Sequence, residues 1–420
     1  MVFETLSETM NINNMPFILP LIPLILGIIW KFSNSSSTIR KGIGLAVIGA
    51  LAGGLIYFRF AIEMEPSVIF LVSAILLSGF CSLLSQEDSQ QGPDIYASIM
   101  IVLGLGLGVL LNEAILGRVF LCGLLGYIAT SLNREQQKTF RTKIILLHIV
   151  FAITLSLTSI FMGETSQMLA GLFLALTFLP MAPFHLPFVK TIKDAKETLS
   201  SFWIVVWLMI GLDQLKNIYS FLTDEILFIL SILAILSAIY ASLVALGQKV
   251  NSLFVASATL AHSALIWGLL QVFPSFSKWG IPFGITLALV IGGLSLAFSF
   301  VQIRYGCKTI GNLPGLLSTM PRLGVVIVLL VCFALFLPIF PAYLGLGVMP
   351  TIETKDVGVV MTSLLFSVVW LGGSWYFIKM LHQTAFGEAR TDIPYSDLGP
   401  KEVLSISVLI LAATYSGIIF

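Results

Sequence analysis

Long apolar stretches recur along the whole of this 420-residue sequence, and they constrain its fold more than any other feature. A helix needs roughly 20 mainly apolar residues to cross the roughly 30 Å hydrocarbon core of a bilayer. With 57% hydrophobic and only 10% charged residues, the chain is too apolar for a water-soluble domain, and we predict an all-α polytopic membrane protein. About fourteen windows qualify, at residues 16–32, 42–58, 66–85, 96–112, 114–131, 143–163, 166–188, 200–216, 225–247, 251–273, 279–303, 322–345, 357–379 and 402–420.

The 22 lysines and arginines predict the orientation of the chain. Basic loops are retained in the cytoplasm during membrane insertion. The connections after odd-numbered windows hold all of these residues except Arg118, which lies inside the fifth window, and Arg59, Lys216, Lys278 and Lys355 on the opposite side. We therefore expect both termini on the non-cytoplasmic side of a bacterial cytoplasmic membrane or an equivalent energy-converting membrane. Topology accounts for the basic loops, and with a net charge of +1 we expect no nucleic-acid partner.

Two windows contain the same proline-rich sequence, F-L-P-x-x-P-x-x-L. It begins at Phe178 in the seventh window and at Phe336 in the twelfth. Proline removes an intrahelical hydrogen bond, so both helices are predicted to break, and such backbone survives in lipid only where protein or a polar cavity covers it. The motifs lie five windows apart, an odd number, so the two helices run in opposite directions. The prolines concerned are Pro180 and Pro183 in one motif and Pro338 and Pro341 in the other.

Matched breaks in oppositely oriented helices indicate two inverted five-helix repeats, an arrangement that marks ion or substrate pathways in transporters. A pair of kinks that only improve packing is the alternative. The predicted organisation is helices 1–3 in residues 1–95, a first repeat in 96–218, a second repeat in 219–381, and a cytoplasmic loop with the last helix in 382–420.

Five ionisable side chains within the windows are singled out as candidates, because a charge inside a membrane is costly unless it is paired or hydrated. Each has a functional and a structural interpretation. Arg118 either belongs to a proton path or pairs with Glu113 and extends to the surface. Asp213 either transfers protons or lies at the interface near Lys216. The histidines are His148, His185 beside the second proline of its motif, and His262, which follows Ser257 and Thr259 and either relays protons or bonds a neighbouring helix.

The sequence lacks a nucleophile–base–acid set, a metal-ligand spacing and a nucleotide motif, so we predict no catalytic, cofactor or metal site in this chain. The run Gly104, Gly106 and Gly108 is interpreted as close helix packing. Cys81, Cys122, Cys307 and Cys332 are interpreted as small packing residues.

Several short motifs occur in the order found in one known family. They are the Pro180–His185 segment of the broken helix, the Ala256–His262 segment, Met320-Pro321, Phe386-Gly387 and the Asp397–Glu402 segment. In these motifs the chain resembles the antiporter-like membrane subunits shared by respiratory complex I (NADH:quinone oxidoreductase), membrane-bound hydrogenases and Mrp-type cation/proton antiporters. The resemblance covers about residue 166 to the C-terminus and implies fourteen helices with inverted five-helix repeats.

The chain departs from this family where proton transfer would be expected. Aligned on the motifs, Phe178 and Ser252 occupy positions where the family has basic residues, and Leu346 a position where it has an acid. Asp213 aligns with a lysine of helix eight, and Arg118 to Phe120 surround the position of a buried glutamate in helix five. The resemblance thus implies a divergent member whose proton channel has lost its ionisable stations.

The resulting hypothesis is a membrane subunit of a larger redox or ion-translocating complex, with a structural or coupling role. Other membrane subunits and bilayer lipid are its expected partners, and iron–sulfur or flavin cofactors would lie in partner subunits. Two alternatives remain open. One is an active proton or cation translocator that uses a rerouted path through His185, Asp213 and His262, and the other is an independent secondary transporter.

Overall fold

The described part of the chain is entirely helical, apart from one isolated bridge between Val250 and Thr309. The structure is a computed structural model that describes residues 15–418 except 34, 62–63, 87–92, 113, 134–139, 162, 197, 272, 274 and 337–356. The helices are α2 (Met15–Phe32), α3 (Ser37–Ala61), α4 (Pro66–Ser85), α5 (Pro93–Leu111), α6 (Ala114–Asn133), α7 (Phe140–Thr158), α8 (Glu164–Phe178), α9 (Leu186–Asp194), α10 (Leu199–Ile218), α11 (Asp224–Gly247), α12 (Asn251–Leu269), α13 (Phe276–Tyr305), α14 (Leu316–Thr319), α15 (Pro321–Phe336), α17 (Val357–Thr384) and α18 (Pro400–Ile418), with short 3-10 turns at Ser159–Phe161 and Tyr219–Phe221.

Each of the fourteen predicted windows overlaps a helix of the described residues, and the seventh overlaps a broken one. Within the described residues, nine helices are long and apolar enough to cross a membrane. Four shorter apolar helices lie in the first, fourth, seventh and twelfth windows, and α18 lies in the fourteenth. The all-helical, polytopic architecture is confirmed, whereas the number of crossings and the sidedness of the termini stay predictions.

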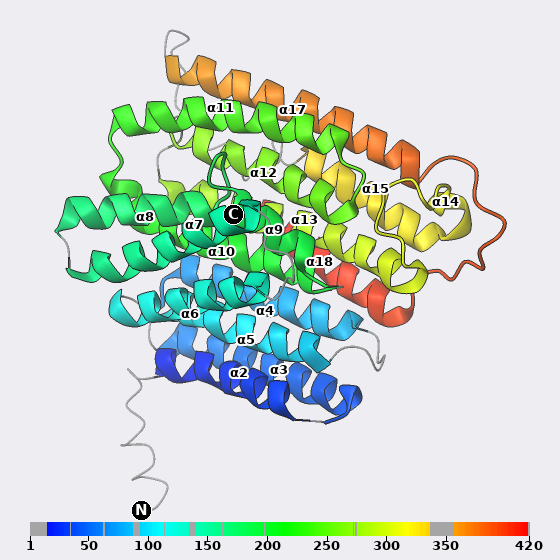
Figure 1. The fold of residues 1–420 in the computed structure, drawn as a ribbon, viewed down its shortest axis with the longest axis horizontal. Helices are drawn as coiled ribbons and strands as arrows, with labels where there is room; N and C mark the ends of the chain where they lie inside the picture. The colour runs from blue at the N-terminus through cyan, green and yellow to red at the C-terminus, as the bar shows by residue number, and fades with distance from the viewer. Residues whose placement is uncertain are drawn as a thin grey trace, which may run out of the picture. The chain divides into compact units, whose positions relative to one another are not determined.

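The chain forms two compact units, one up to Ala170 and one from Gly171. In the first unit α2 and α5 lie antiparallel and in direct contact (Figure 1). Glycine permits this closeness: a Cβ at Gly27 would lie 2.9 Å from the carbonyl oxygen of Ala97, and one at Gly104 would lie 2.7 Å from that of Pro20. At Gly108 a Cβ would meet the ring of Phe120 on α6. Close packing therefore explains Gly104 and Gly108 of the glycine run.

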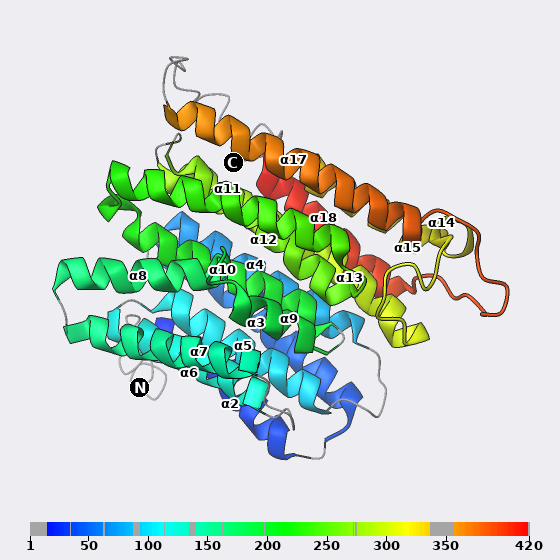
Figure 2. The ribbon, with the colours of Figure 1, turned by 45° about the horizontal axis from the view of Figure 1, so that its top comes forward.

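In the second unit α13 is the central helix, packed by α10, α12, α15 and α18 (Figure 2). The helices α11 and α17 lie side by side on the outside of α12. The unit boundary lies inside α8 and does not test the predicted repeats, which stay a prediction. Of the two predicted helix breaks, the first is present, because α8 ends at Phe178 and α9 begins at Leu186. Pro338 and Pro341 lie outside the described residues.

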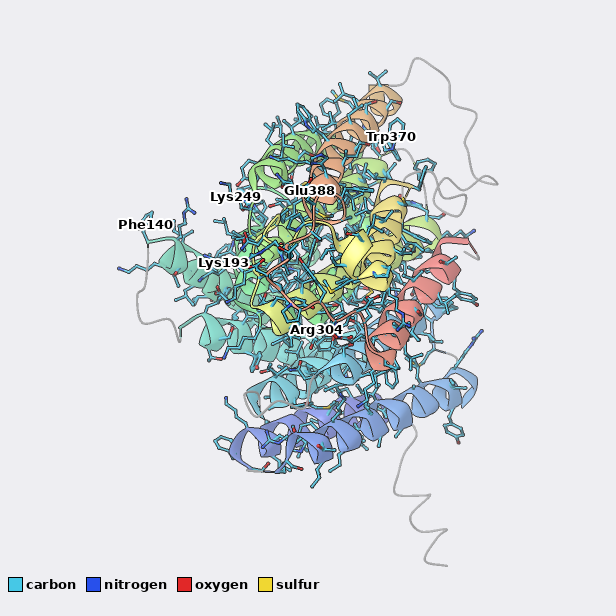
Figure 3. The ribbon with its side chains drawn as sticks, turned by 90° about the vertical axis from the view of Figure 1, so that its right-hand side faces the viewer. Phe140, Lys193, Lys249, Arg304, Trp370 and Glu388 are labelled. Carbon is cyan, nitrogen blue, oxygen red and sulfur yellow. The ribbon has the colours of Figure 1, made fainter. Side chains whose placement is uncertain are left out.

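Charged side chains tie helices together at one end of the second unit. Figure 3 labels one of them, Arg304. Arg304, in the last turn of α13, forms an ion pair with Glu402 in the first turn of α18. The carboxylate of Asp397 accepts the backbone N–H groups of Arg322 (2.9 Å) and Leu323 (3.2 Å) at the start of α15. These N–H groups have no partner within their own helix. We call Arg304, Arg322, Asp397 and Glu402 the end clasp, because they tie α13, α15 and α18 together.

The sequence motifs near the C-terminus meet at this same end. Asp397 and Glu402 belong to the end clasp, and the Phe386-Gly387 motif packs on the turn before α14. There the N–H of Gly315 donates to the carbonyl of Phe386 (3.2 Å). Gly315 has φ +75°, and a Cβ at this residue would lie 2.9 Å from the carbonyl oxygen of Gly387. These motifs therefore build the connections between helices.

The end clasp predicts an asymmetry between two ion pairs at this end. Glu402→Gln removes the carboxylate that pairs with Arg304. The side chain of Glu402 is 10% exposed and that of Arg304 is 16% exposed. We expect a loss of about 1.5–3 kcal/mol of unfolding free energy, because hydrogen bonds to charged groups are among the stronger ones. The measurement is the apparent melting temperature of the purified protein.

Asp392→Asn is the matched control. Arg390 donates to the Asp392 carboxylate and lowers its pKa, but both side chains are largely exposed. Water and salt screen such a pair, so this variant is expected to have the same melting temperature as the wild type. Equal melting temperatures for both variants and the wild type would show that the end clasp does not stabilise the fold.

Candidate functional site

The broken helix between α8 and α9 is the most irregular described backbone within the predicted membrane windows. Residues 179–185 form turns, and two of them are prolines without an N–H group. Local hydrogen bonds satisfy only part of this segment: the N–H of Leu179 reaches the carbonyl of Ala175 (2.7 Å), and that of Phe184 reaches Met181 (2.7 Å). An unpaired backbone group costs several kcal/mol in hydrocarbon, so the remaining groups need partners from other helices.

Three side chains donate hydrogen bonds to the carbonyls at the break. The indole N–H of Trp207 on α10 donates to the carbonyl of Thr177 (2.9 Å). On α12, the indole N–H of Trp267 donates to the carbonyl of Leu179 (3.2 Å), and the hydroxyl of Ser263 donates to that of Pro180 (2.7 Å). Trp207, Trp267 and Ser263 are fully buried. The carbonyls of Thr177, Leu179 and Pro180, at the start of the break, are therefore bonded by protein side chains.

A fourth side chain, from α11, accepts a hydrogen bond from the break. The N–H of Ala182 donates to the hydroxyl oxygen of Ser237, which is itself buried (3.0 Å). On α10, Gly211 lies against the break so closely that a Cβ would be 2.5 Å from the backbone nitrogen of Leu179. We call Gly211 and the four side chains Trp207, Ser237, Ser263 and Trp267 the break seal. It holds the irregular segment between three helices.

Phe178 ends α8 at the position where the family resemblance implies a basic residue. Its side chain is fully buried, and its ring centroid lies 5.1 Å from that of Trp207. Trp207 also contacts the rings of Phe188 (5.7 Å) and Trp203 (6.2 Å). The position is thus part of an aromatic cluster, and a phenyl ring neither accepts nor releases a proton.

His262, one residue before Ser263 of the break seal, is 2% exposed. Its Nδ1 lies 2.9 Å from the carbonyl oxygen of Ala258 and 3.1 Å from the hydroxyl of Tyr376 on α17. Because a carbonyl only accepts, a proton on Nδ1 would suit this arrangement. His262 therefore fastens α12 to α17.

The hydroxyl groups expected around His262 have other partners. Ser257 donates to the carbonyl of Leu253 (2.8 Å), and Thr259 donates to that of Val255 (2.8 Å). Both bonds stay within α12. The hydroxyl that does reach the imidazole belongs to Tyr376, which sequence reasoning missed because it lies 114 positions further along the chain.

The two other titratable groups of this unit that the sequence singled out have separate surroundings. His185, at the end of the break, is 8% exposed, and its ring centroid lies 5.4 Å from that of Tyr240 on α11. Asp213 lies near the end of α10, where the amides of Gln214 (3.2 Å) and Asn217 (3.4 Å) donate to its carboxylate. The structure gives these positions, and a role in proton transfer stays a prediction for both.

Arg118 and His148 lie in the first unit, on α6 and α7, and both are partly exposed. Glu113, the expected partner of Arg118, lies outside the described residues. Across the described residues, no group of three or more His, Cys, Asp or Glu side chains is arranged to hold a metal ion.

Sequence reasoning missed most of the break seal, although one signal was present. Tryptophan is enriched at membrane interfaces, where its N–H group meets water. Trp207 and Trp267 lie well inside their windows instead. A tryptophan buried there requires an acceptor for its N–H group, and a proline-broken helix supplies free carbonyls. Ser237 and Gly211 carry no comparable signal in the sequence.

No family model matches the chain. It is 26% identical to NADH-quinone oxidoreductase subunit M of Rickettsia prowazekii over 249 residues, covering 57% of this chain and 50% of that protein. It is 24% identical to F(420)H(2) dehydrogenase subunit M of Methanosarcina mazei over 315 residues, covering 71% of this chain and 60% of the relative. The chain thus spans about half the length of the first relative.

Solved structures match almost the whole chain. One chain of respiratory complex I from Thermus thermophilus superposes with a TM-score of 0.76 at 17% identity, covering 96% of this chain and 95% of that one. One chain of the Mrp complex from Dietzia sp. superposes with a TM-score of 0.75 at 12% identity, covering 97% and 95%. The protein is therefore a distant homologue of the M subunits, and it has the fold of the antiporter-like chains of these complexes.

The break seal predicts which substitutions loosen the broken helix. Ser263→Ala removes the donor to the Pro180 carbonyl and leaves that acceptor buried without its partner, a loss of about 1–3 kcal/mol. We expect amide hydrogen exchange of residues 179–185 to accelerate about fivefold or more, because local opening becomes easier by that free energy. Hydrogen–deuterium exchange with mass spectrometry measures it.

Ser257→Ala is the control, because its buried hydroxyl donates within α12. This variant is expected to leave exchange at the break unchanged. If both variants exchanged alike, the seal would not hold the break.

Proposed function

We propose that this chain is an antiporter-like membrane subunit of an assembly related to complex I, with a degenerate proton channel and a structural or coupling role. The observation that carries the proposal is the break seal. In this class of fold the interrupted helix is where an ion path is expected. Here α10, α11 and α12 supply buried side chains to the backbone groups of the break.

The side chains around the break support the same conclusion. A proton relay requires ionisable or hydrated groups at short intervals. Phe178 contributes a phenyl ring packed on Trp207, and Ser257 and Thr259 donate their protons to their own helix. His262 is held by the Ala258 carbonyl of its own helix and by the Tyr376 hydroxyl on α17. These features favour a rigid interior over a water-filled path.

The role in an assembly rests on the relatives. The M subunits belong by name to an NADH-quinone oxidoreductase and an F(420)H(2) dehydrogenase, and the structural neighbours are chains of multi-subunit complexes. We infer that this chain lies beside other membrane subunits in an energy-converting membrane, while iron–sulfur or flavin cofactors lie in partner subunits. It would supply lateral helix contacts and transmit conformational or electrostatic change.

One observation favours a second candidate, an active translocator. Asp213 and His262 are both buried in the second unit, and buried ionisable groups in membrane helices mark proton paths in many transporters. Their partners differ, since the Asp213 carboxylate accepts from amides of its own helix, whereas the His262 ring lies against the Ala258 carbonyl and the Tyr376 hydroxyl on α17. The two proposals therefore predict different results on mutation.

Purification from the native membrane tests the assembly role. The tagged chain would be extracted in mild detergent, and everything that stays bound would be identified by mass spectrometry. We expect stoichiometric membrane subunits together with iron–sulfur or flavin proteins. A chain that purifies alone and is stable would instead favour an independent secondary transporter.

Proton flux tests the degenerate channel. The purified assembly would be reconstituted in vesicles with Asp213→Asn or His262→Gln, the glutamine retaining an N–H donor for Ala258. We expect proton flux within about twofold of the wild type, because neither group is a relay station in the proposal. A tenfold loss in a fully assembled variant would establish the active translocator, and mass spectrometry of the same sample checks that the complex is complete.

A further inference from the structure

Three helix ends in the first unit line a small polar pocket that opens to the surface, where Lys31, Thr130 and Ser131 are exposed. The pocket has a volume of about 40 Å³, several times the roughly 10–15 Å³ that one water molecule requires. It lies where α2 ends, α5 begins and α6 ends. Its polar lining consists of one lysine and four hydroxyl side chains, Lys31, Ser98, Tyr127, Thr130 and Ser131.

Lys31 brings the positive charge of this pocket. The neighbouring basic side chains are engaged elsewhere, since Arg40 donates to the carbonyl of Ser33 (2.5 Å) and Lys41 to that of Gln86 (2.5 Å). Lys31, in contrast, makes no hydrogen bond or ion pair with any residue that the structure describes. An ammonium group in this position has three donors available for an anion.

The hydroxyl groups suit a ligand that also brings donors. Thr130 donates its proton to the carbonyl of Tyr127 (2.8 Å), and Ser131 donates to that of Ile128 (2.7 Å). Their oxygen atoms therefore line the pocket as acceptors. Tyr127 donates to Ser98 across the pocket (2.8 Å) and fixes the two walls. A phosphate on Lys31 with a hydroxylated head group beside Thr130 and Ser131 would satisfy both kinds of group.

The position along the helices fits a lipid rather than a free ion. Lys31 is the penultimate residue of α2, so the pocket lies at the height where a membrane helix meets the phosphate layer. The same helix exposes apolar side chains just before this end, including Ile28 (45% exposed), Ile29 (55%) and Phe32 (82%). Acyl chains can pack along such a surface. The basic loops that follow odd-numbered windows place this end at the cytoplasmic leaflet in the predicted topology.

The packing of α2 on α5 keeps the pocket in shape. Gly27 approaches the backbone of Ala97, which is itself part of the lining, and Gly104 approaches that of Pro20 about two turns further along. Two helices in backbone contact cannot separate easily, because each glycine packs against the backbone of the other helix. The site is therefore preformed, which lowers the entropic cost of binding.

We propose that this pocket binds the head group of an anionic glycerophospholipid, with the phosphate at Lys31 and head-group hydroxyls at Thr130 and Ser131. The site is independent of the proposed function of the second unit. It gives the protein a lipid specificity of its own.

Lipid binding to the purified protein tests the proposal. Native mass spectrometry would measure retention of phosphatidylglycerol, with phosphatidylcholine and inorganic phosphate as separate probes. Lys31→Gln is expected to weaken phosphatidylglycerol binding about fivefold, as about 1 kcal/mol per basic residue at a membrane surface implies. Lys31→Arg is expected to restore it, which separates the charge from an effect on folding.

Lys143→Gln is the matched control, since this lysine is exposed near the start of α7 outside the pocket. Its phosphatidylglycerol binding is expected within twofold of the wild type. Equal retention in Lys31→Gln and the wild type would overturn the proposal. So would binding of inorganic phosphate, without phosphatidylglycerol, that depends on Lys31, because the pocket would then be a site for a free anion.

Discussion

The requirement that every backbone polar group find a partner inside the protein governs this structure. A membrane offers no water for unpaired N–H and carbonyl groups, so regular helices are the default and every interruption must be covered. The break after Phe178 is the clearest case. Its proline-rich sequence removes the usual helical hydrogen bonds. Three neighbouring helices supply replacement partners through the side chains of Trp207, Trp267, Ser263 and Ser237.

The same requirement shapes the ends of the helices. In the end clasp, Asp397 accepts the first N–H groups of α15, and Arg304 pairs with Glu402 at the start of α18. Arg304, Arg322 and Glu402 lie at helix ends and Asp397 in the loop before α18, and their bonds fix where α13, α15 and α18 meet. Charges here organise connections, whereas the interior of the second unit relies on aromatic packing and on hydroxyls bonded to backbone.

A transporter-like fold and a non-conducting interior are compatible in physical terms. The interrupted helix is part of the fold of the second unit, and its backbone groups need partners whether or not an ion passes. In an ion path, water or ionisable side chains form hydrogen bonds with these backbone groups. In a packed core, buried indoles and hydroxyls do so. Phe178 against Trp207 illustrates the second solution, because two aromatic rings occupy a position where a relay group would have to be hydrated.

Hydrophobic length and proline chemistry are local properties, and so the sequence by itself determined the helical architecture, the positions of the helices and the break at Pro180 and Pro183. It also singled out His262 and Asp213, because ionisable residues are rare in apolar windows. Only the tertiary structure decided which side chains form hydrogen bonds with the backbone groups of the break. Ser237 and Gly211 look ordinary in sequence, and Tyr376 lies 114 positions from His262. Their roles arise from contacts between helices, which depend on how the helices pack and not on the local pattern of residues.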